Sequence, residues 1–392
     1  MAKKGNNEGS IYNKDKQGRW RGQVNLPSPD GKIRRKYFYG KTRKEVADKV
    51  TELIRQINSN TYIEPSKVTL YEWLCEWLEI YCKPELRVTT YVNYELYIER
   101  HIKDSIGVCR MSDLNTTMFQ QYYNQKFQNG KLNGNGGLSP KTLRNLHNML
   151  HKALDQAVNL DMISKNPVTY AVLPKSQKKE MRYFTESEQR ELQEAIKGDR
   201  LEMAILIALY TGVRQGELLG LKWDNVRIDL NGQSYIRIVE TLCRVKNYDE
   251  TTNNKTVLSV NIPKTRHSVR TIPLLPDIAK KLDEYRMKQR EFIFENGYTD
   301  LGYVIISTIG TPLDSRSFQR DFKLLLRRNN IREVNVHGLR HTFATRALES
   351  GMSPKTLSKI LGHSSVGFTL DTYAHVTDDL KFTEMQSMNN FL

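Results

Sequence analysis

Apolar residues recur at intervals of three and four residues through the region from Thr69 to Pro167. This spacing places them along one face of a helix, and tryptophans at such positions normally pack in a core. The sequence therefore predicts a helical domain over residues 66–170, in which Asn129–Gly137 is a loop between two helices. The residues with this spacing are Leu70, Trp73, Leu74, Trp77 and Leu78, and then Leu143, Leu146, Leu150 and Leu154.

The N-terminal region has a different pattern. Three short β-prone runs, at residues 10–12, 20–26 and 33–39, are separated by turn residues. Thr42 is placed to cap a helix that runs to about residue 58, with Glu45 at the capping-box position. A small β-sheet followed by a helix is therefore expected over residues 1–60.

Positive charge is concentrated in that predicted sheet. The chain carries a formal net charge of +16, and nine Lys or Arg residues lie between Arg19 and Lys44 against one acid, Asp30. A basic ribbon with interleaved aromatics suits a DNA groove, although lysines on a surface sheet can also serve to protect an edge strand. We favour the ribbon, with candidate DNA contacts at Arg19, Arg21, Lys32, Arg34, Arg35 and Lys36.

Residues 59–68, with Pro65, form a first predicted linker. A second linker, around residues 175–180, precedes a mainly helical region with β-prone segments at 235–245, 256–263 and 269–274. The predicted fold class is therefore a multidomain α+β protein with domains at 1–60, 66–170 and 181–392. The four cysteines lack metal-ligand spacing and suggest a reducing, cytoplasmic setting without disulfides. The start of the chain has no apolar signal region, and no apolar run is long enough to span a bilayer.

Three short segments in residues 181–392 contain candidate catalytic residues. In the first, Thr211–Leu218, Gly212 permits a tight turn that brings Arg214 to the start of a helix, where Glu217 can hold its guanidinium. Taken alone, such a pair is usually a surface salt bridge.

The second segment is His337-Gly338-Leu339-Arg340-His341, in which His337 and Arg340 share one face of a helix. The i, i+4 histidines could also suggest a metal. No glutamate lies between them as in a zinc peptidase, and no third ligand is evident, so no metal site is predicted.

The third segment joins Gly362-His363 to Tyr373. Ser353 and Pro354 are suited to begin a helix that Gly362 ends, so that His363 falls at a corner. Taken singly, His363 is a structural histidine and Tyr373 is one packing residue among 20 tyrosines.

Together, in this order, these residues resemble the tyrosine recombinase (phage integrase) family. TGVRQGELLGLKW, VHGLRHTFAT and LGHSSVGFTLDTYAHV each look like a box of that family. Residues 69–170 resemble, more weakly, its core-type DNA-binding domain. The basic N-terminal sheet looks like the arm-type DNA-binding domain of conjugative-transposon and temperate-phage integrases.

The resemblance implies a role for each matching residue. Arg214 and Arg340 would clamp the phosphate, and Glu217 is the acidic position of the first box. His337 would be the histidine of the second box, His363 would be at the position held by His or Trp, and Tyr373 would be the nucleophile. Lys264 is the best match for the family's hairpin lysine, with Lys255 and Arg266 close by.

The residue types fit this chemistry. Arginines can stabilise the charge that grows on a phosphodiester in the transition state. Tyrosine, with an ordinary pKa of about 10, needs a base or a cationic pocket to attack. His337 could accept its proton, and Lys264 could donate one to the 5′-oxygen. A 3′-phosphotyrosine conserves the ester bond energy, so no ATP, metal or cofactor is expected.

We therefore predict an integrase that also excises its element. The expected partners are double-stranded DNA at core and arm sites, three further copies in a homotetramer, a directionality factor and a host DNA-bending protein. A type IB topoisomerase, a DNA-binding regulator without catalysis and a tyrosine relaxase are the alternatives. The apolar residues of the tail from Asp378 to Leu392 predict a short amphipathic helix that docks on a neighbouring protomer or packs on its own domain.

Overall fold

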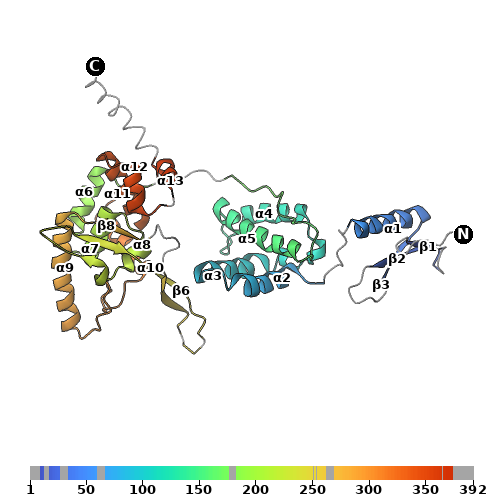
Figure 1. Ribbon diagram of the computed structural model, residues 1–392, viewed down its shortest axis with the longest axis horizontal. Coiled ribbons are helices and arrows are strands. Elements are labelled where there is room, and N and C mark those ends of the chain that lie inside the picture. Colours follow the sequence, from blue (N-terminus) through green and yellow to red (C-terminus); the bar gives the residue numbers. More distant parts are fainter. Residues whose placement is uncertain are drawn as a thin grey trace, which may run out of the picture. The chain divides into compact units, whose positions relative to one another are not determined.

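The structure is a computed structural model of the 392-residue chain. It describes residues 9–12, 17–26, 34–59, 67–175, 182–249, 251–252, 254–261, 269–363 and 365–373. The chain divides into two compact units, Met1–Gln177 and Lys178–Leu392 (Figure 1). Within the described ranges, no helix has the length and apolar character needed to cross a membrane.

The first unit begins with an antiparallel sheet in the order β1-β2-β3, covered on one face by helix α1. Thr42 caps α1 by accepting a hydrogen bond from the Glu45 N–H, as predicted, but the Glu45 carboxylate accepts from the Lys41 N–H in place of that of Thr42. A Cβ on Gly22 would lie 2.7 Å from side-chain atoms of Val46 and Val50, so glycine allows α1 to approach the sheet closely. The elements are β1 (Ser10–Tyr12), β2 (Trp20–Leu26), β3 (Arg34–Gly40) and α1 (Arg43–Asn58).

The strand register defines the other face of this sheet. Arg21 lies opposite both Tyr12 and Tyr39, and Asn25 lies opposite Arg35. Side chains directly opposite each other in an antiparallel pair project from the same face, so these residues form one free surface.

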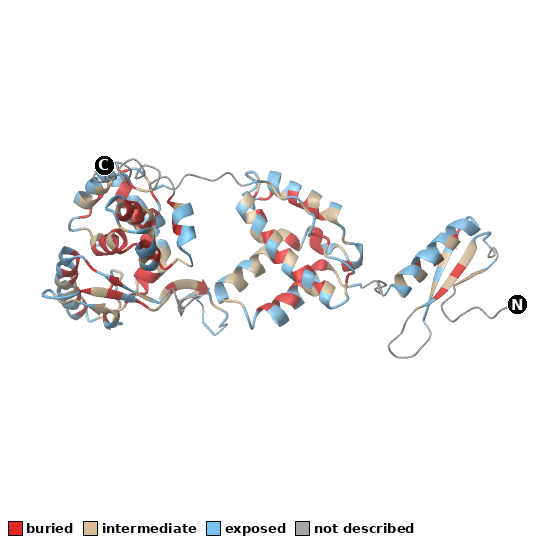
Figure 2. Cartoon of the chain, turned by 45° about the horizontal axis from the view of Figure 1, so that its top comes forward, coloured by how far each residue is buried: buried red, intermediate tan, exposed pale blue. Residues whose placement is uncertain are grey.

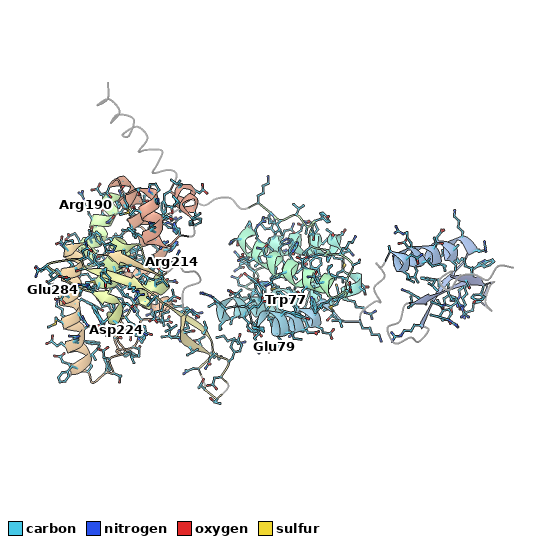
Figure 3. The ribbon with its side chains drawn as sticks, viewed as in Figure 1. Trp77, Glu79, Arg190, Arg214, Asp224 and Glu284 are labelled. Atoms are coloured by element: carbon cyan, nitrogen blue, oxygen red, sulfur yellow. The ribbon has the colours of Figure 1, made fainter. Side chains whose placement is uncertain are left out.

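A separate core holds the helical part of the same unit together. Trp73 and Trp77 are 1% exposed, and Trp73 Nε1 donates a hydrogen bond to the Ala153 carbonyl at 3.0 Å, so both tryptophans are core residues as predicted. Figures 2 and 3 show the buried residues and Trp77 between the helices. The α-helices are α2 (Leu70–Trp77), α3 (Val88–Tyr97), α4 (Thr116–Asn129) and α5 (Pro140–Asn159); α2 and α3 continue as π-helical turns, Leu78–Cys82 and Ile98–Ile102.

The second unit packs helices around a small antiparallel sheet in the order β4-β5-β8, with a separate hairpin, β6-β7. Its central helix α7 is buried on all sides, which explains the apolar run of this segment. Its strands are β4 (Val226–Arg227), β5 (Tyr235–Ile238), β6 (Thr241–Lys246), β7 (Thr256–Asn261) and β8 (Arg270–Pro273). Its helices are α6 (Glu186–Ala195), α7 (Glu202–Thr211), α8 (Gln215–Leu219), α9 (Pro276–Glu295), α10 (Ser315–Arg328), α11 (Val336–Glu349), α12 (Pro354–Leu361) and α13 (Val366–Thr372).

Candidate active site

Two left-handed glycines bring the three predicted segments together. Gly212 ends α7 with φ 61°, and a Cβ there would lie 2.4 Å from the Phe343 ring and 2.7 Å from a Leu361 methyl. Gly362 ends α12 with φ 64°, as the sequence predicts. Both turns require glycine for the backbone conformation, and Gly212 requires it also for the close packing against α11 and α12.

The carbonyl end of α12 gathers three arginines. Arg270 Nε donates to the Ile360 carbonyl at 2.5 Å, Arg340 Nη2 to Leu361 at 2.8 Å, and Arg214 Nη2 to Gly362 at 3.1 Å. The last carbonyls of a helix lack partners within the helix and carry partial negative charge, so cations are stabilised there.

Arg214 is the N-cap residue of α8, where the sequence places it (Figure 3). Its Nη1 donates to Glu217 Oε1 at 2.8 Å, and its backbone N–H donates to Oε2, also at 2.8 Å. Glu217 is 2% exposed and the Arg214 side chain is 40% exposed, so the predicted pair joins a buried carboxylate to a partly exposed guanidinium. Burial alone would raise the pKa of the Glu217 carboxyl, but Arg270 and then Arg214 hold it below its ordinary value.

Arg340 lies on the buried side of α11 and is 2% exposed. Its Nη1 donates to the Gly212 carbonyl at 2.7 Å, in addition to the bond to Leu361. Burial and then the charge of Arg214 lower the pKa of Arg340 to about 9, which still leaves the guanidinium charged at neutral pH.

Tyr373 follows α13 directly and is 1% exposed. Its hydroxyl lies 2.9 Å from Nδ1 of His341. Burial raises the pKa of Tyr373 to about 12, against the opposing effect of the Arg340 charge. The histidine that contacts this hydroxyl is thus His341, which the sequence suggested only as a metal ligand.

The other two predicted histidines also border this region. His337 is exposed at the start of α11, and its ring meets that of His341 edge-on at 4.7 Å between centroids. Partial desolvation and then the charges of Arg340 and Arg214 lower the pKa of His337. His363 follows Gly362, and its Nδ1 lies 2.7 Å from the Thr369 hydroxyl. Burial and then the Arg340 and Arg214 charges lower the pKa of His363 to about 4.

The structure brings together Arg214, Glu217, Arg340, His363 and Tyr373, with His337 beside them. Lys264, its neighbour Arg266 and the tail from Asp378 lie outside the described residues, as does Lys32. Among the described residues, no group of three or more His, Cys, Asp or Glu side chains is arranged to hold a metal ion.

Sequence reasoning missed Arg270 and the contact of His341. Arg270 binds both oxygens of Glu217, with Nη1–Oε1 at 3.1 Å and Nη2–Oε2 at 2.8 Å. Its position directly after the segment that carries Lys264 was the only signal in the sequence. For His341, the signal was its place next to Arg340, one helical turn after His337.

In the N-terminal sheet, the candidate contacts divide between two faces. Arg21 and Arg35 lie on the free face, and the Arg21 guanidinium stands 4.3 Å from the centre of the Tyr37 ring. Arg19, just before β2, stands 5.0 Å from the centre of the Tyr39 ring. The alternation of the strand directs Arg34 and Lys36 to the side of α1.

The fold and this cluster define a class of DNA strand-breaking and rejoining enzymes, the tyrosine recombinases. Residues 182–379 match the model of the phage integrase family, and residues 69–127 match that of the phage integrase N-terminal SAM-like domain. The chain belongs to the phage integrase family and is a site-specific tyrosine recombinase of the mobile-element integrase type.

Its relatives agree with this assignment. A "Tyrosine recombinase XerC-like" protein of Caldanaerobacter subterraneus subsp. tengcongensis is 33% identical, over 92% of this chain and 93% of its own length. The Tn1549 transposon integrase, solved with transposon right end DNA, matches with a TM-score of 0.66 and 24% identity over 82% of this chain and 99% of that one. A lambda integrase tetramer bound to a Holliday junction matches with a TM-score of 0.54 and 20% identity over 92% and 94%.

Proposed function

We propose that the chain cuts and rejoins double-stranded DNA through a covalent bond between Tyr373 and a 3′-phosphate. The observation that carries the proposal is the placement of Arg214 and Arg340 on adjacent carbonyls, Gly362 and Leu361, beside the buried Tyr373. Together with Arg270 they supply three positive charges against the one of Glu217. This excess of positive charge favours an anion, and a DNA phosphodiester supplies it.

In this reaction the Tyr373 oxygen forms a bond to phosphorus as the bond between phosphorus and the 5′-oxygen breaks. Arg214 and Arg340 stabilise the added negative charge on the non-bridging oxygens. The number of phosphoester bonds is unchanged, so a second 5′-hydroxyl can reverse the step without ATP.

Two proton transfers accompany the step. Because burial raises the pKa of Tyr373, its proton must leave as the oxygen attacks, and His337, whose lowered pKa keeps it neutral, is the proposed acceptor. Lys264 is the proposed donor to the leaving 5′-oxygen. His363 is proposed to donate a hydrogen bond from its ring N–H to a non-bridging oxygen of the phosphate.

Each of three domains would contact a different part of the DNA or carry out the reaction. We assign residues 1–60 to arm-type sites, 66–170 to core-type sites and 181–392 to catalysis, and the separate hydrophobic cores of the first two regions support the division. Four copies would act together on two DNA duplexes, by analogy with the lambda integrase tetramer on its junction. A directionality factor and a host DNA-bending protein would set the direction of recombination.

A suicide substrate with a nick beside the scissile phosphate tests the central claim. Wild-type protein should accumulate a covalent protein–DNA adduct, whereas Tyr373→Phe, which loses only the hydroxyl, should bind the same DNA and form none. Tyr285→Phe is the matched control, because it deletes the hydroxyl of a partly buried tyrosine of the same unit. An adduct formed by the Tyr373→Phe protein would disprove the assignment.

A further inference from the structure

Tyr373 is held inside the protein in this DNA-free structure. Its ring packs in a small hydrophobic cluster with Leu357, Leu361 and alanines of α11, and it is 1% exposed. A nucleophile so enclosed cannot reach a phosphate on the surface of a DNA duplex, so its side chain has to move before it attacks.

The polar end of Tyr373 is anchored by a single described side-chain contact, Nδ1 of His341 at 2.9 Å. The rings are 5.8 Å apart between centroids and inclined at 60°. His341 is itself fixed, because it lies on α11 one residue after the buried Arg340 and meets the His337 ring edge-on. The hydroxyl is thus tied to helix α11, which also carries the buried Arg340.

We propose that His341 is a positioning residue that holds the Tyr373 hydroxyl and keeps the nucleophile enclosed until DNA is bound. This inference rests on the assignment of Tyr373 as the nucleophile. It gives His341 a role in restraint that is separate from proton transfer by His337 and from phosphate binding by the arginines.

The protonation state of His341 is suited to such a restraint. Burial and then the neighbouring His337 and Arg340 charges lower the pKa of His341 to about 4, so the ring is neutral at pH 7. A neutral imidazole can form one hydrogen bond with the phenol hydroxyl, in which Nδ1 is the donor or the acceptor according to the tautomer of the ring. A neutral hydrogen bond contributes modestly to stability, and such a contact restrains the side chain but can be broken when DNA binds.

Hydroxyl-radical footprinting of the full chain, read by tandem mass spectrometry, measures the restraint. Cleavage after Lys359 and Lys381 yields a peptide in which Tyr373 is the only tyrosine. Phe368 lies in the same peptide and is 54% exposed, so it provides an internal reference for the dose.

Two substitutions separate the hydrogen bond from the ring. His341→Phe keeps an aromatic ring but loses Nδ1, and oxidation of Tyr373 relative to Phe368 should rise about two- to tenfold, the range expected for one neutral hydrogen bond. His341→Asn keeps a polar atom at the position of Nδ1 and should restore oxidation to near the wild-type level. His147→Phe is the matched control, because His147 Nδ1 lies 3.3 Å from the hydroxyl of buried Tyr123 in the other unit.

Equal oxidation of Tyr373 in His341→Phe and wild type would overturn the proposal. It would also be overturned if His341→Asn, with wild-type oxidation, formed the covalent adduct more than tenfold more slowly than wild type at saturating DNA, since His341 would then act in the chemical step. The oxidation measurements on Tyr373 do not depend on the proposed function. If Tyr373→Phe still cleaved DNA, the nucleophile assignment would fail while the oxidation data still reported the contact.

Discussion

Arg270 donates hydrogen bonds to both carboxylate oxygens of Glu217, and the two side chains are only 6% and 2% exposed. Glu217 accepts from Arg214 as well, so one buried carboxylate connects the two arginines. In the proposed reaction, Arg270 would therefore act on the phosphate site through Glu217, as a positioning residue. Its Nε contact with Ile360 also ties strand β8 to the end of α12.

Replacing Arg270 by Gln should leave Glu217 without its main cation. Loss of one partner of a buried pair lowers the free energy of unfolding by about 3–5 kcal/mol, and thermal unfolding of the full chain should show this. Arg237→Gln, an exposed position on the adjacent strand β5, should cause little change.

A double variant tests the cause. Adding Glu217→Gln to Arg270→Gln removes the unpaired charge, so the double variant should unfold at a higher temperature than Arg270→Gln alone. If the two effects simply add, the Arg270–Glu217 pair does not account for the loss.

Arg214→Lys should impair cleavage more than binding. Lysine keeps the charge but cannot contact Glu217, Gly362 and a phosphate oxygen together through one planar fork. We expect covalent adduct formation to slow more than tenfold, with affinity for core-site DNA nearly unchanged. Arg227→Lys, on the exposed strand β4, is the control, and a cleavage rate within about threefold of wild type would exclude Arg214 from the active site.

The free face of the N-terminal sheet predicts which arginines contact arm-type DNA. Arg21→Gln and Arg35→Gln should each weaken arm-site binding and make it less dependent on salt, because each lost phosphate contact reduces counterion release. Arg55→Gln, on helix α1 that covers the opposite face, should bind normally. Equal effects at all three positions would indicate a contact that does not depend on the face of the sheet.

Stability should depend on pH through the two half-buried histidines His341 and His363. His341 and His363 have pKa values of about 4 in the folded protein, below the ordinary value of 6.5. Between these values the unfolded chain binds protons that the folded chain does not, so the contribution of these two histidines to stability falls as pH is lowered through this window and levels off below about pH 4. Urea unfolding of the full chain at pH 7 and pH 5 measures the change, which should be smaller in His363→Gln. An undiminished change in that variant would show that His363 is not a source of the pH dependence.

Much of the fold follows from local sequence. The Thr42 and Ser353 caps, the left-handed Gly212 and Gly362, and the tryptophans of α2 are all where the residue pattern predicts them. Local signals succeed here because capping, left-handed turns and the burial of one helix face depend on residues a few positions apart.

The order of the three segments also determined the class of enzyme. The sequence alone, however, gave no distances among them. From the sequence, Arg214 and Glu217 could form a salt bridge that lies on the surface. In the sequence, His341 is only one of two histidines with the spacing of metal ligands.

Only the tertiary structure decided how these residues meet. Arg214 and Gly362 are separated by 148 positions, and Arg270 and Ile360 by 90, so no periodicity along the chain records their contacts. The packing of α7, α11 and α12 around Gly212 fixes the position of the C-terminal end of α12. The last carbonyls of α12 then accept hydrogen bonds from three arginines that lie on three different elements. The same packing turns His341 toward Tyr373, because burial of Arg340 on one side of α11 fixes the direction of the residue that follows it.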